Sequence, residues 1–361
     1  MSDPFARDVW AIMGMPLDNV TLDEAASLIE RAVETRERLS FVTPNVNWLV
    51  RALKDDTAMQ QIVNADLSVA DGAPVVWLAR QLGMPLKERV AGSDLFERLR
   101  QDKSSNAKPI RVFFFGGRDG AAEAACKVLE AENGRIIPAG WHNPGFGSVE
   151  DMTTADIQAK INAAKPDFVL VALGAAKGQA WIEANLTALE APVIAHLGAV
   201  VDFVAGSINR APSFISRIGM EWAWRIVAEP SLWKRYWSDG WALISLIRGR
   251  LGKLKKASNP QNDTPFVASV QDGGIVLSGP LTHENQNQIR DTFRTAELGA
   301  NTQLDLSEAN AIDAAGLGQI RMLQHAIHRQ NGSLVITLAP HLNALAVAAG
   351  LKPLLASQPH T

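Results

Sequence analysis

One acidic residue stands where a parallel α/β sheet would place a catalytic group. Asp71 comes directly after the apolar run Leu67–Ala70 and precedes Gly72. A carboxylate at the end of a buried strand faces the ligand cleft, where partial burial can raise its pKa and let it deprotonate a hydroxyl. Aspartate is equally a good N-cap for a following helix, and Pro74 suits the first turn of that helix. The position alone supports a general base and a helix cap equally.

Hydroxyl and amide side chains follow other apolar runs. Thr43 and Asn45 come at the end of Leu39–Thr43, where they could bind a sugar or phosphate, although ordinary turn chemistry also explains them. Ser93 opens an expected helix whose N-terminus could bind an anion or cap itself. These residues are candidate substrate contacts.

Phosphate binding has weaker support, and metal binding has none. Gly116 and Gly117 follow Ile110–Phe115 like a phosphate-cradling turn, but dinucleotide-binding spacing is absent. Cys126 is the single cysteine, the seven histidines lack metal-ligand spacing, and no Asp-x-Asp pair precedes residue 248. We therefore expect no metal and no cofactor, and bound phosphates would rely on helix N-termini and on Arg or Lys. His325 and His328 are expected to be solvent-exposed.

The elements that would position these residues alternate between helix and strand. Thr21–Thr35 is typical of an amphipathic helix with a capping box at Thr21 and Glu24. Continuous apolar runs indicate strands buried on both faces, and ligands of such sheets lie at the carboxyl ends of the strands. The first unit is therefore predicted to be an open, mostly parallel, Rossmann-like α/β sheet. Its expected strands are Leu39–Thr43, Leu67–Ala70, Ile110–Phe115, Phe168–Leu173 and Val193–Leu197.

A second, smaller α/β unit follows a polar stretch from Arg248 to Pro265, which we interpret as a linker. The second unit is predicted to begin with a hairpin and to continue with alternating helices and strands. The expected order is strand Phe266–Val270, strand Ile275–Ser278, helix His283–Leu298, strand Gln303–Leu306, a turn at Ile312–Leu317 opening a helix to Arg329, strand Ser333–Leu338 and helix His341–Ala349.

Length and composition agree with two globular domains. The chain has 361 residues, of which 47% are hydrophobic and 20% charged, which excludes disordered and low-complexity classes. The N-terminus shows no signal-peptide pattern. The longest apolar stretch, Ala191–Gly206, contains His196 and Asp202 and is too short to span a bilayer. A cytoplasmic location is expected.

Positive charge and tryptophan are concentrated in one segment. Residues 210–256 hold ten Lys or Arg against three acidic residues, a balance of +7, and five of the ten tryptophans. Basic side chains between indoles suit an anionic membrane surface. They also suit nucleic acid, or the indoles could simply be core. We favour the membrane surface over these alternatives.

Most of the first unit resembles the WecG/TagA/CpsF glycosyltransferases, carbohydrate-active family 26. The resemblance covers about residues 10–245 and rests on FVTPNVNWLV, ADLSVADGAPVVWLARQLGMPLKERVAGSDL, VFFFGG, INAAKPDFVLVALGAAKGQAWI, AHLGAVVDFVAG and RAPSFISRIGMEWAWRIVAEP. It implies metal-independent, inverting transfer from a UDP-sugar to a polyprenyl-diphosphate-linked sugar in exopolysaccharide, capsule or cell-wall assembly. It also implies peripheral association with the inner face of the plasma membrane, and no nucleic-acid partner.

The resemblance also implies roles for individual residues. Asp71 matches the family's general base, and Asp202 matches an acidic residue near the nucleotide. The family usually has Gln where this chain has Gly178, with Gln179 next to it. Thr43 and Asn45 match residues lining the substrate pocket, and Arg210, Arg225 and Arg235 match arginines of the family's C-terminal appendage. With the residues singled out above, the candidate substrate-binding set also includes Gly72, Arg89, Ser93, Gly116, Gly117, Gly174, Lys177 and Gln179.

The second unit resembles a STAS domain. LDLSEANAIDAAGLGQI matches the STAS strand and helix start, with Ala314 where a phosphorylatable Ser would stand, so the usual switch is absent. A role in protein contacts or self-association is expected, and truncation after about Lys256 should then leave transferase activity. The expected division is 1–209 transferase, 210–247 membrane-associating appendage, 248–264 linker and 265–361 STAS-like domain.

Two functions follow. The first is an active transferase, with UDP-Glc, UDP-GlcNAc, UDP-ManNAc or its uronate as donor. The second is a catalytically silent nucleotide-binding regulator acting through its STAS domain. The presence of Asp71 favours the active transferase, whereas Gly178 in place of the usual Gln favours the catalytically silent regulator.

Overall fold

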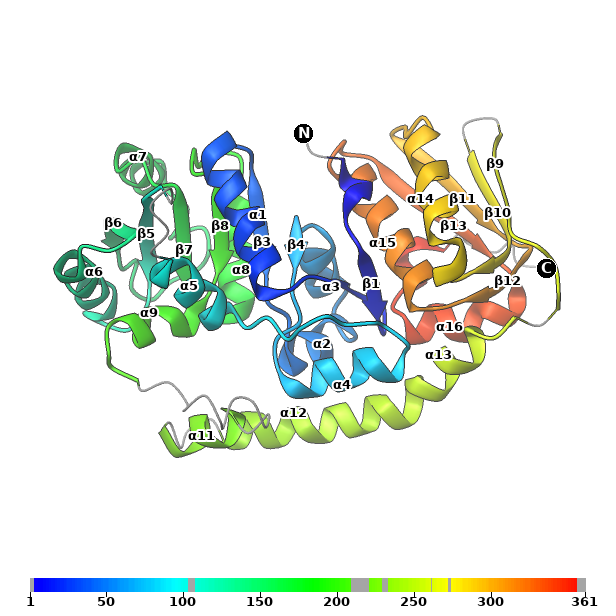
Figure 1. Cartoon of the computed structure of the whole chain (residues 1–361), viewed down its shortest axis with the longest axis horizontal. Coiled ribbons are helices and arrows are strands. Elements are labelled where there is room, and N and C mark those ends of the chain that lie inside the picture. Colours follow the sequence, from blue (N-terminus) through cyan, green and yellow to red (C-terminus); the bar gives the residue numbers. More distant parts are fainter. Residues whose placement is uncertain are drawn as a thin grey trace.

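The apolar runs of the first unit form one six-stranded sheet in the computed structural model of the protein (Figure 1). The structure describes residues 3–102, 108–208, 221–228, 233–260, 262–271 and 274–355. All neighbouring strands are parallel, in the order β4-β3-β8-β7-β5-β6, and the five expected strands are confirmed. The strands are β3 (Leu39–Val42), β4 (Leu67–Ser68), β5 (Ile110–Gly116), β6 (Ile136–His142), β7 (Phe168–Ala172) and β8 (Val193–His196).

Helices cover both faces of this sheet because successive strand residues point to opposite sides. Phe114 and Leu170 lie in one apolar cluster with α1, α5, α6 and α9, whereas Phe113 and Val171 lie in another with α7 and α8. Helix α1 carries the expected capping box. The helices are α1 (Leu22–Thr35), α5 (Gly92–Gln101), α6 (Ala121–Glu132), α7 (Ala155–Ala163), α8 (Ala175–Asn185) and α9 (Gly198–Val204).

The C-terminal unit has its own mixed sheet, in the order β12-β10-β11-β13 with β9 paired to β10. The expected hairpin of β9 and β10 is confirmed. Two expectations were incomplete: Ile312 ends a strand, β12, parallel to β10, and the helix expected from His283 begins at Gln286 after a 3-10 turn. The elements are β9 (Val267–Gln271), β10 (Gly274–Leu281), α14 (Gln286–Thr295), β11 (Asn301–Leu306), β12 (Ala309–Ile312), α15 (Ala314–His328), β13 (Ser333–Leu338) and α16 (Asn343–Ala348).

An N-terminal hairpin that the sequence did not suggest lies between the two units (Figure 1). It pairs β1 (Val9–Ile12) with β2 (Met15–Asp18) through Met13 and Gly14, whose φ angles of 52° and 84° suit a two-residue hairpin turn. All eight strand residues are buried, because β1 packs on α15 while β2 packs on α3 (Asp56–Val63). The hairpin therefore joins the two units.

Helix α15 is the centre of this junction, and all residues from Ala314 to Ile327 are buried. A Cβ on Gly318 would lie 2.1 Å from the Val9 carbonyl oxygen, so only glycine allows this approach. Arg321 Nε donates to Gly14 O at 2.8 Å, and Nη2 donates to Ala349 O at 3.0 Å. One apolar cluster contains residues of both units. The two domains thus share a core.

His325, expected to be exposed, is buried in this junction, whereas His328 is exposed as expected. The reason is that the end of α3 and Asp66, which follows it, pack on the helix face that solvent was expected to meet. His325 Nδ1 donates to Val63 O at 2.9 Å, and Nε2 lies 3.8 Å from Asp66 Oδ1. Burial, with Arg7 nearby, lowers the pKa of His325 to about 4.

This burial predicts a pH-dependent stability. The unfolded chain binds a proton on His325 near pH 6.5, whereas the folded chain does so only near pH 4. Protonation of His325 therefore favours the unfolded chain in this pH range. The free energy of unfolding has its full value above pH 6.5 and falls by about 3 kcal/mol as the pH drops toward 4. His325→Gln should flatten the dependence of the unfolding free energy on pH in this window. His328→Gln, on the same helix but exposed, should leave it unchanged.

A long helical segment crosses from one domain to the other beneath the molecule in Figure 1. It comprises α12 (Trp233–Leu246), a π-helical turn (Ile247–Leu251) and α13 (Gly252–Ala257). The linker interpretation was therefore wrong for residues 248–257: Leu254 is buried, and Arg250 Nη1 donates to the carbonyl oxygens of Val347 and Ala348. No helix within the described residues is long and apolar enough to cross a membrane.

Candidate active site

Asp71 lies just beyond β4, beside the end of β3. Backbone pairing continues past the strands, because Val69 N donates to Val42 O and Asp71 N donates to Pro44 O, each at 3.0 Å. The Asp71 side chain is 27% exposed. Helix α4 (Ala73–Gln81) has Gly72 as its N-cap, with a φ of 90° that favours glycine. The alternative that Asp71 is the N-cap is therefore wrong.

Arg89 is the cation next to Asp71. Its Nη1 lies 3.8 Å from Asp71 Oδ1, and its Nη2 donates to Asp94 Oδ2 at 2.8 Å. The backbone around Arg89 is held against the sheet because Val90 N donates to Ala70 O. Guanidinium groups in this setting bind phosphate oxygens well. Arg89 therefore lies where it can bind a substrate phosphate next to Asp71.

The first turn of α5 meets the ends of β3 and β8. A Cβ on Gly92 would lie 3.2 Å from Thr43 Cγ2 and 2.5 Å from Leu197 Cδ2, so glycine lets these three segments converge. Ser93 is the second residue of α5, and the N-cap, Ala91, makes no side-chain hydrogen bond. Thr43 and Ser93 therefore lie at the same edge of the sheet as Asp71.

Asn45 has a structural task. Its Oδ1 accepts from Asn47 N at 3.1 Å and from Trp48 N at 3.4 Å, and it is the N-cap of α2 (Val46–Ala52). This capping accounts for asparagine at this position, as turn chemistry predicted. A substrate contact by Asn45 remains a prediction.

The glycine pair after β5 is required by a close backbone approach. Gly116 and Gly117 have φ angles of 87° and 99°. Gly117 N donates to Ala172 O at 2.7 Å, and a Cβ on Gly116 would lie 2.8 Å from that oxygen. The packing of β5 on β7 explains both glycines without a phosphate.

Asp202 forms a second charged pair at this edge of the sheet. It is 8% exposed, on α9, and its Oδ1 accepts from Ser207 Oγ at 3.3 Å. Arg118 Nε, from the turn after β5, lies 3.8 Å from Asp202 Oδ2. The turn and α9 are neighbours, since a Cβ on Gly117 would be 3.4 Å from Val201 Cγ1. An exposed cation next to a buried carboxylate suits the expected position near a nucleotide.

Helix α8 supplies three further predicted residues. Gly174 is its N-cap, without a side-chain hydrogen bond, and Lys177 Nζ donates to Gly147 O at 2.6 Å. Gln179 is 3% exposed, and its Oε1 has no hydrogen-bond partner among the described residues. Lys177 is thus occupied by the chain itself, and Gln179 faces inward.

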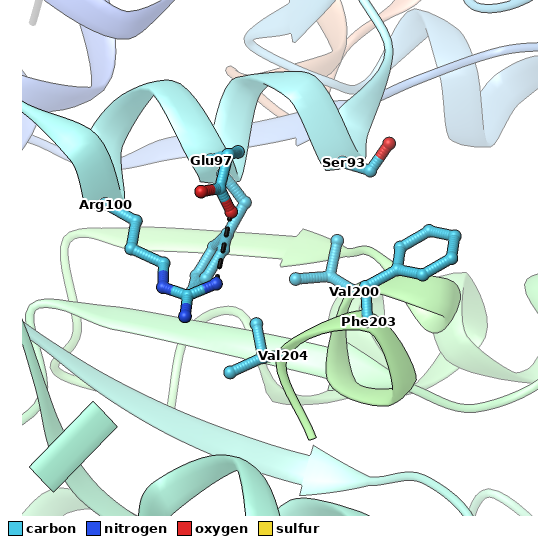
Figure 2. A pocket seen from close by; sticks show the side chains of 7 residues that line it. Ser93, Glu97, Arg100, Val200, Phe203 and Val204 are labelled. Carbon is cyan, nitrogen blue, oxygen red and sulfur yellow. Dashed lines mark hydrogen bonds and ion pairs between the residues drawn. The ribbon is translucent and has the colours of Figure 1, made fainter. Parts of the chain in front are cut away.

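A small cavity lies between α5 and α9, and Figure 2 shows its lining side chains. Of the predicted residues only Ser93 lines it, together with Phe96, Glu97, Arg100, Val200, Phe203 and Val204. Arg100 Nη1 pairs with Glu97 at 3.2 Å across its wall. Its volume of about 30 Å³ is too small for a sugar nucleotide.

The predicted arginines of the appendage are only partly placed. Arg210 lies outside the described residues. Arg225 belongs to α11 (Glu221–Ala228), and its side chain is likewise outside the description. The Arg235 guanidinium lies over the Tyr236 ring, 5.4 Å from its centroid, on α12.

The tryptophans of α12 lie on its outer side. Trp233, Trp237 and Trp241 are 51%, 64% and 58% exposed, at a four-residue spacing that places them on one face. On another face, Asn47 Nδ2 of α2 donates to Asp239 at 3.3 Å, and Leu243 packs against the core. The core interpretation is therefore wrong for these three indoles. We call Trp233, Trp237 and Trp241 the outer tryptophan face.

Two features of this region were missed from the sequence. His196 ends β8 as Asp71 follows β4, but it was considered only as a metal ligand. Arg118, in the turn after β5, was not singled out in the sequence. Within the described ranges, no group of three or more His, Cys, Asp or Glu residues could hold a metal ion.

Comparison with known proteins identifies the family to which the chain belongs. The model of the glycosyl transferase WecG/TagA/CpsF family matches residues 10–257, and that of "Mlab, STAS domain" matches residues 266–356. An N-acetylglucosaminyldiphosphoundecaprenol N-acetyl-beta-D-mannosaminyltransferase of Bacillus spizizenii is 32% identical over 195 residues, which are 54% of this chain and 73% of the relative.

Two further relatives carry the same name. The Bacillus subtilis protein is 28% identical over 63% of this chain and 82% of its own length. The Staphylococcus aureus protein is 28% identical over 62% of this chain and 85% of its own length. The chain therefore belongs to the WecG/TagA/CpsF glycosyltransferase family and carries a C-terminal STAS domain.

Proposed function

We propose that the protein moves a sugar from a UDP-sugar to a polyprenyl-diphosphate-linked saccharide, with inversion, in exopolysaccharide, capsule or cell-wall glycan assembly. The observation that carries the proposal is Asp71, a partly exposed carboxylate at the sheet's ligand edge that is not the N-cap and lies beside Arg89. The names of the relatives support a polyprenyl-linked acceptor.

Asp71 would act as general base. It would take the proton of the acceptor hydroxyl while that oxygen attacks the sugar's anomeric carbon from the face opposite UDP, which inverts the configuration. The bond from the anomeric carbon to UDP breaks, and UDP leaves as a diphosphate. We assign the stabilisation of its negative charge to Arg89 and to three arginines of the appendage, Arg210, Arg225 and Arg235. Arginines are assigned this role because no Asp-x-Asp pair, which would hold a metal ion under the diphosphate, precedes residue 248.

A transfer assay tests this function. Full-length protein would be incubated with a GlcNAc-diphosphate-polyprenyl acceptor and, in turn, with UDP-Glc, UDP-GlcNAc, UDP-ManNAc and UDP-ManNAc uronate. We expect a lipid-extractable disaccharide from one of these donors. A folded protein that binds UDP and forms no product from any of them would support the alternative, a silent nucleotide-binding regulator.

We also propose that the outer tryptophan face rests on the inner surface of the plasma membrane. Three supports combine: its indoles are exposed, residues 210–256 have a balance of +7, and α12 contacts α2, whose N-cap is Asn45. Indoles favour headgroup depth, and nearby basic residues attract anionic lipids. A polyprenyl-linked acceptor would then meet the active edge of the sheet directly.

Binding to anionic vesicles should be weak, reversible and salt-sensitive, because surface charge attraction is screened within about 10 Å at 0.1 M salt. Replacing Trp237 and Trp241 together by alanine should reduce partitioning at least ~10-fold, since each removes apolar area from the interface. Co-sedimentation measures this. Phe146→Ala, at a fully exposed aromatic far from α12 in sequence, is the control. Equal binding of the double variant and the wild type would contradict this orientation.

A further inference from the structure

We propose that His196 contacts the bound sugar through its Nδ1 atom and positions it. The inference rests on the proposed function and adds a substrate-binding residue to it. His196 is the last residue of β8, in the interior of the sheet between β3 and β7. The register pairs it with Val171 of β7 and places its neighbour Ala195 beside Phe41 of β3. Its ring therefore lies at the carboxyl edge, between the strand ends that lead to Thr43 and Gly174.

The ring is held in one orientation. Nε2 lies 2.5 Å from Leu173 O, and a carbonyl oxygen can only accept, so Nε2 carries the hydrogen. On another side the ring meets Gly178, where a Cβ would lie 2.3 Å from His196 Cδ2 and 3.0 Å from Nε2. Glycine weakens a helix interior, so its presence in α8 fits the space that the ring needs. Gly178 and His196 thus form one packing unit.

This orientation leaves Nδ1 as the acceptor of a neutral imidazole. Burial, with Arg51 nearby, lowers the pKa of His196 and keeps the ring neutral near pH 7. No described residue donates to Nδ1, yet it is not among the buried polar atoms without a partner. His196 is partly exposed. A fixed acceptor on a partly exposed ring suits a donor from the substrate, namely a sugar hydroxyl or an acetamido N–H.

A purely structural role explains the hydrogen bond from Nε2 to Leu173 O but does not explain a fixed acceptor at Nδ1. The two nitrogens can be separated by substitution, because an Asn side chain places its oxygen near the Nδ1 position, whereas a Gln side chain places its amide nitrogen near the Nε2 position. His196→Gln keeps the donor to Leu173 O and loses the acceptor. His196→Asn keeps the acceptor and loses that donor.

Steady-state transfer by the full-length variants tests the inference. We expect His196→Gln to raise the KM of one sugar substrate about 10-fold at an unchanged Tm, the scale of one lost neutral hydrogen bond. His196→Asn should keep this KM within about 3-fold of the wild type. Gly178→Ala leaves His196 present but displaces its ring, so it should raise the same KM. His142→Gln, at the end of the edge strand β6, is the control and should change nothing.

Three outcomes would overturn the inference. Wild-type KM in His196→Gln would show that Nδ1 is unused. Equal losses in the Gln and Asn variants, with lowered Tm values, would show a packing role only. A wild-type protein without turnover would overturn the proposed function and this inference together, whereas an active wild type whose Gln variant keeps the wild-type KM overturns the inference alone.

Discussion

A chain ended at Lys256 is expected to lose cooperative folding and, with it, transfer activity. The absent phosphoacceptor at Ala314 suggested a separable domain, but the structure gives the opposite expectation, because β1 packs on α15. Trp10, Ile12 and Met13 are at most 5% exposed in the whole chain. Burying one large apolar side chain is worth about 1.5–3 kcal/mol, so uncovering three or four approaches a domain's entire stability of about 5–15 kcal/mol.

Calorimetry and a transfer assay on the truncated and full-length chains measure this effect. The full-length chain should unfold in one transition because its domains share a core. The truncated chain should show a much lower Tm or no transition, together with loss of product. A truncated chain with the Tm and turnover of the full-length protein would show that the shared core is dispensable.

A single methyl group should reproduce part of this loss. Gly318→Ala places a Cβ 2.1 Å from Val9 O and must push β1 away from α15, at a cost of about 1–3 kcal/mol. The Tm should then fall by roughly 1–4 °C, because a chain of 361 residues that unfolds in one transition has a large unfolding entropy. Gly240→Ala is the matched control: it also lies inside a helix, α12, but a Cβ there meets nothing within 4 Å, so its Tm should stay or rise slightly.

The main sheet could be predicted because each of its inner strands is a continuous apolar run. β6 could not, since Pro138 and Gly140 interrupt it, and both are tolerated only because β6 is an edge strand with a shift in register. The β1–β2 hairpin has apolar residues on both faces because its partners are α15 and α3, the first about 300 residues away. Nothing local in the sequence indicates such a partner.

The candidate site was predictable where a polar residue follows a buried strand, as with Asp71. The sequence could not decide whether Asp71 is a general base or the N-cap of α4. The position of the N-cap depends on the backbone conformation of Gly72, whose φ angle is 90°. His325 was misjudged for the same reason as the hairpin, since a distant segment covers it. Gly178 looked like a loss of function, whereas the structure shows that it accommodates His196.

Asp71→Asn is expected to lower turnover by at least ~100-fold, the usual scale for losing a general base. Asparagine has nearly the same shape but cannot accept the proton of the acceptor hydroxyl. UDP binding and the Tm should change little, because the side chain is partly exposed and Gly72, not Asp71, caps α4. Asp156→Asn, an exposed carboxylate in the first turn of α7, should keep wild-type turnover.

The most direct measurement is the initial rate of lipid-linked disaccharide formation by full-length wild type and Asp71→Asn, side by side, with the preferred UDP-sugar. The account predicts steady product formation by the wild type and a rate at least ~100-fold lower for the variant, at an unchanged KM for the donor. Near-equal rates would show that Asp71 is not the base and would contradict the account.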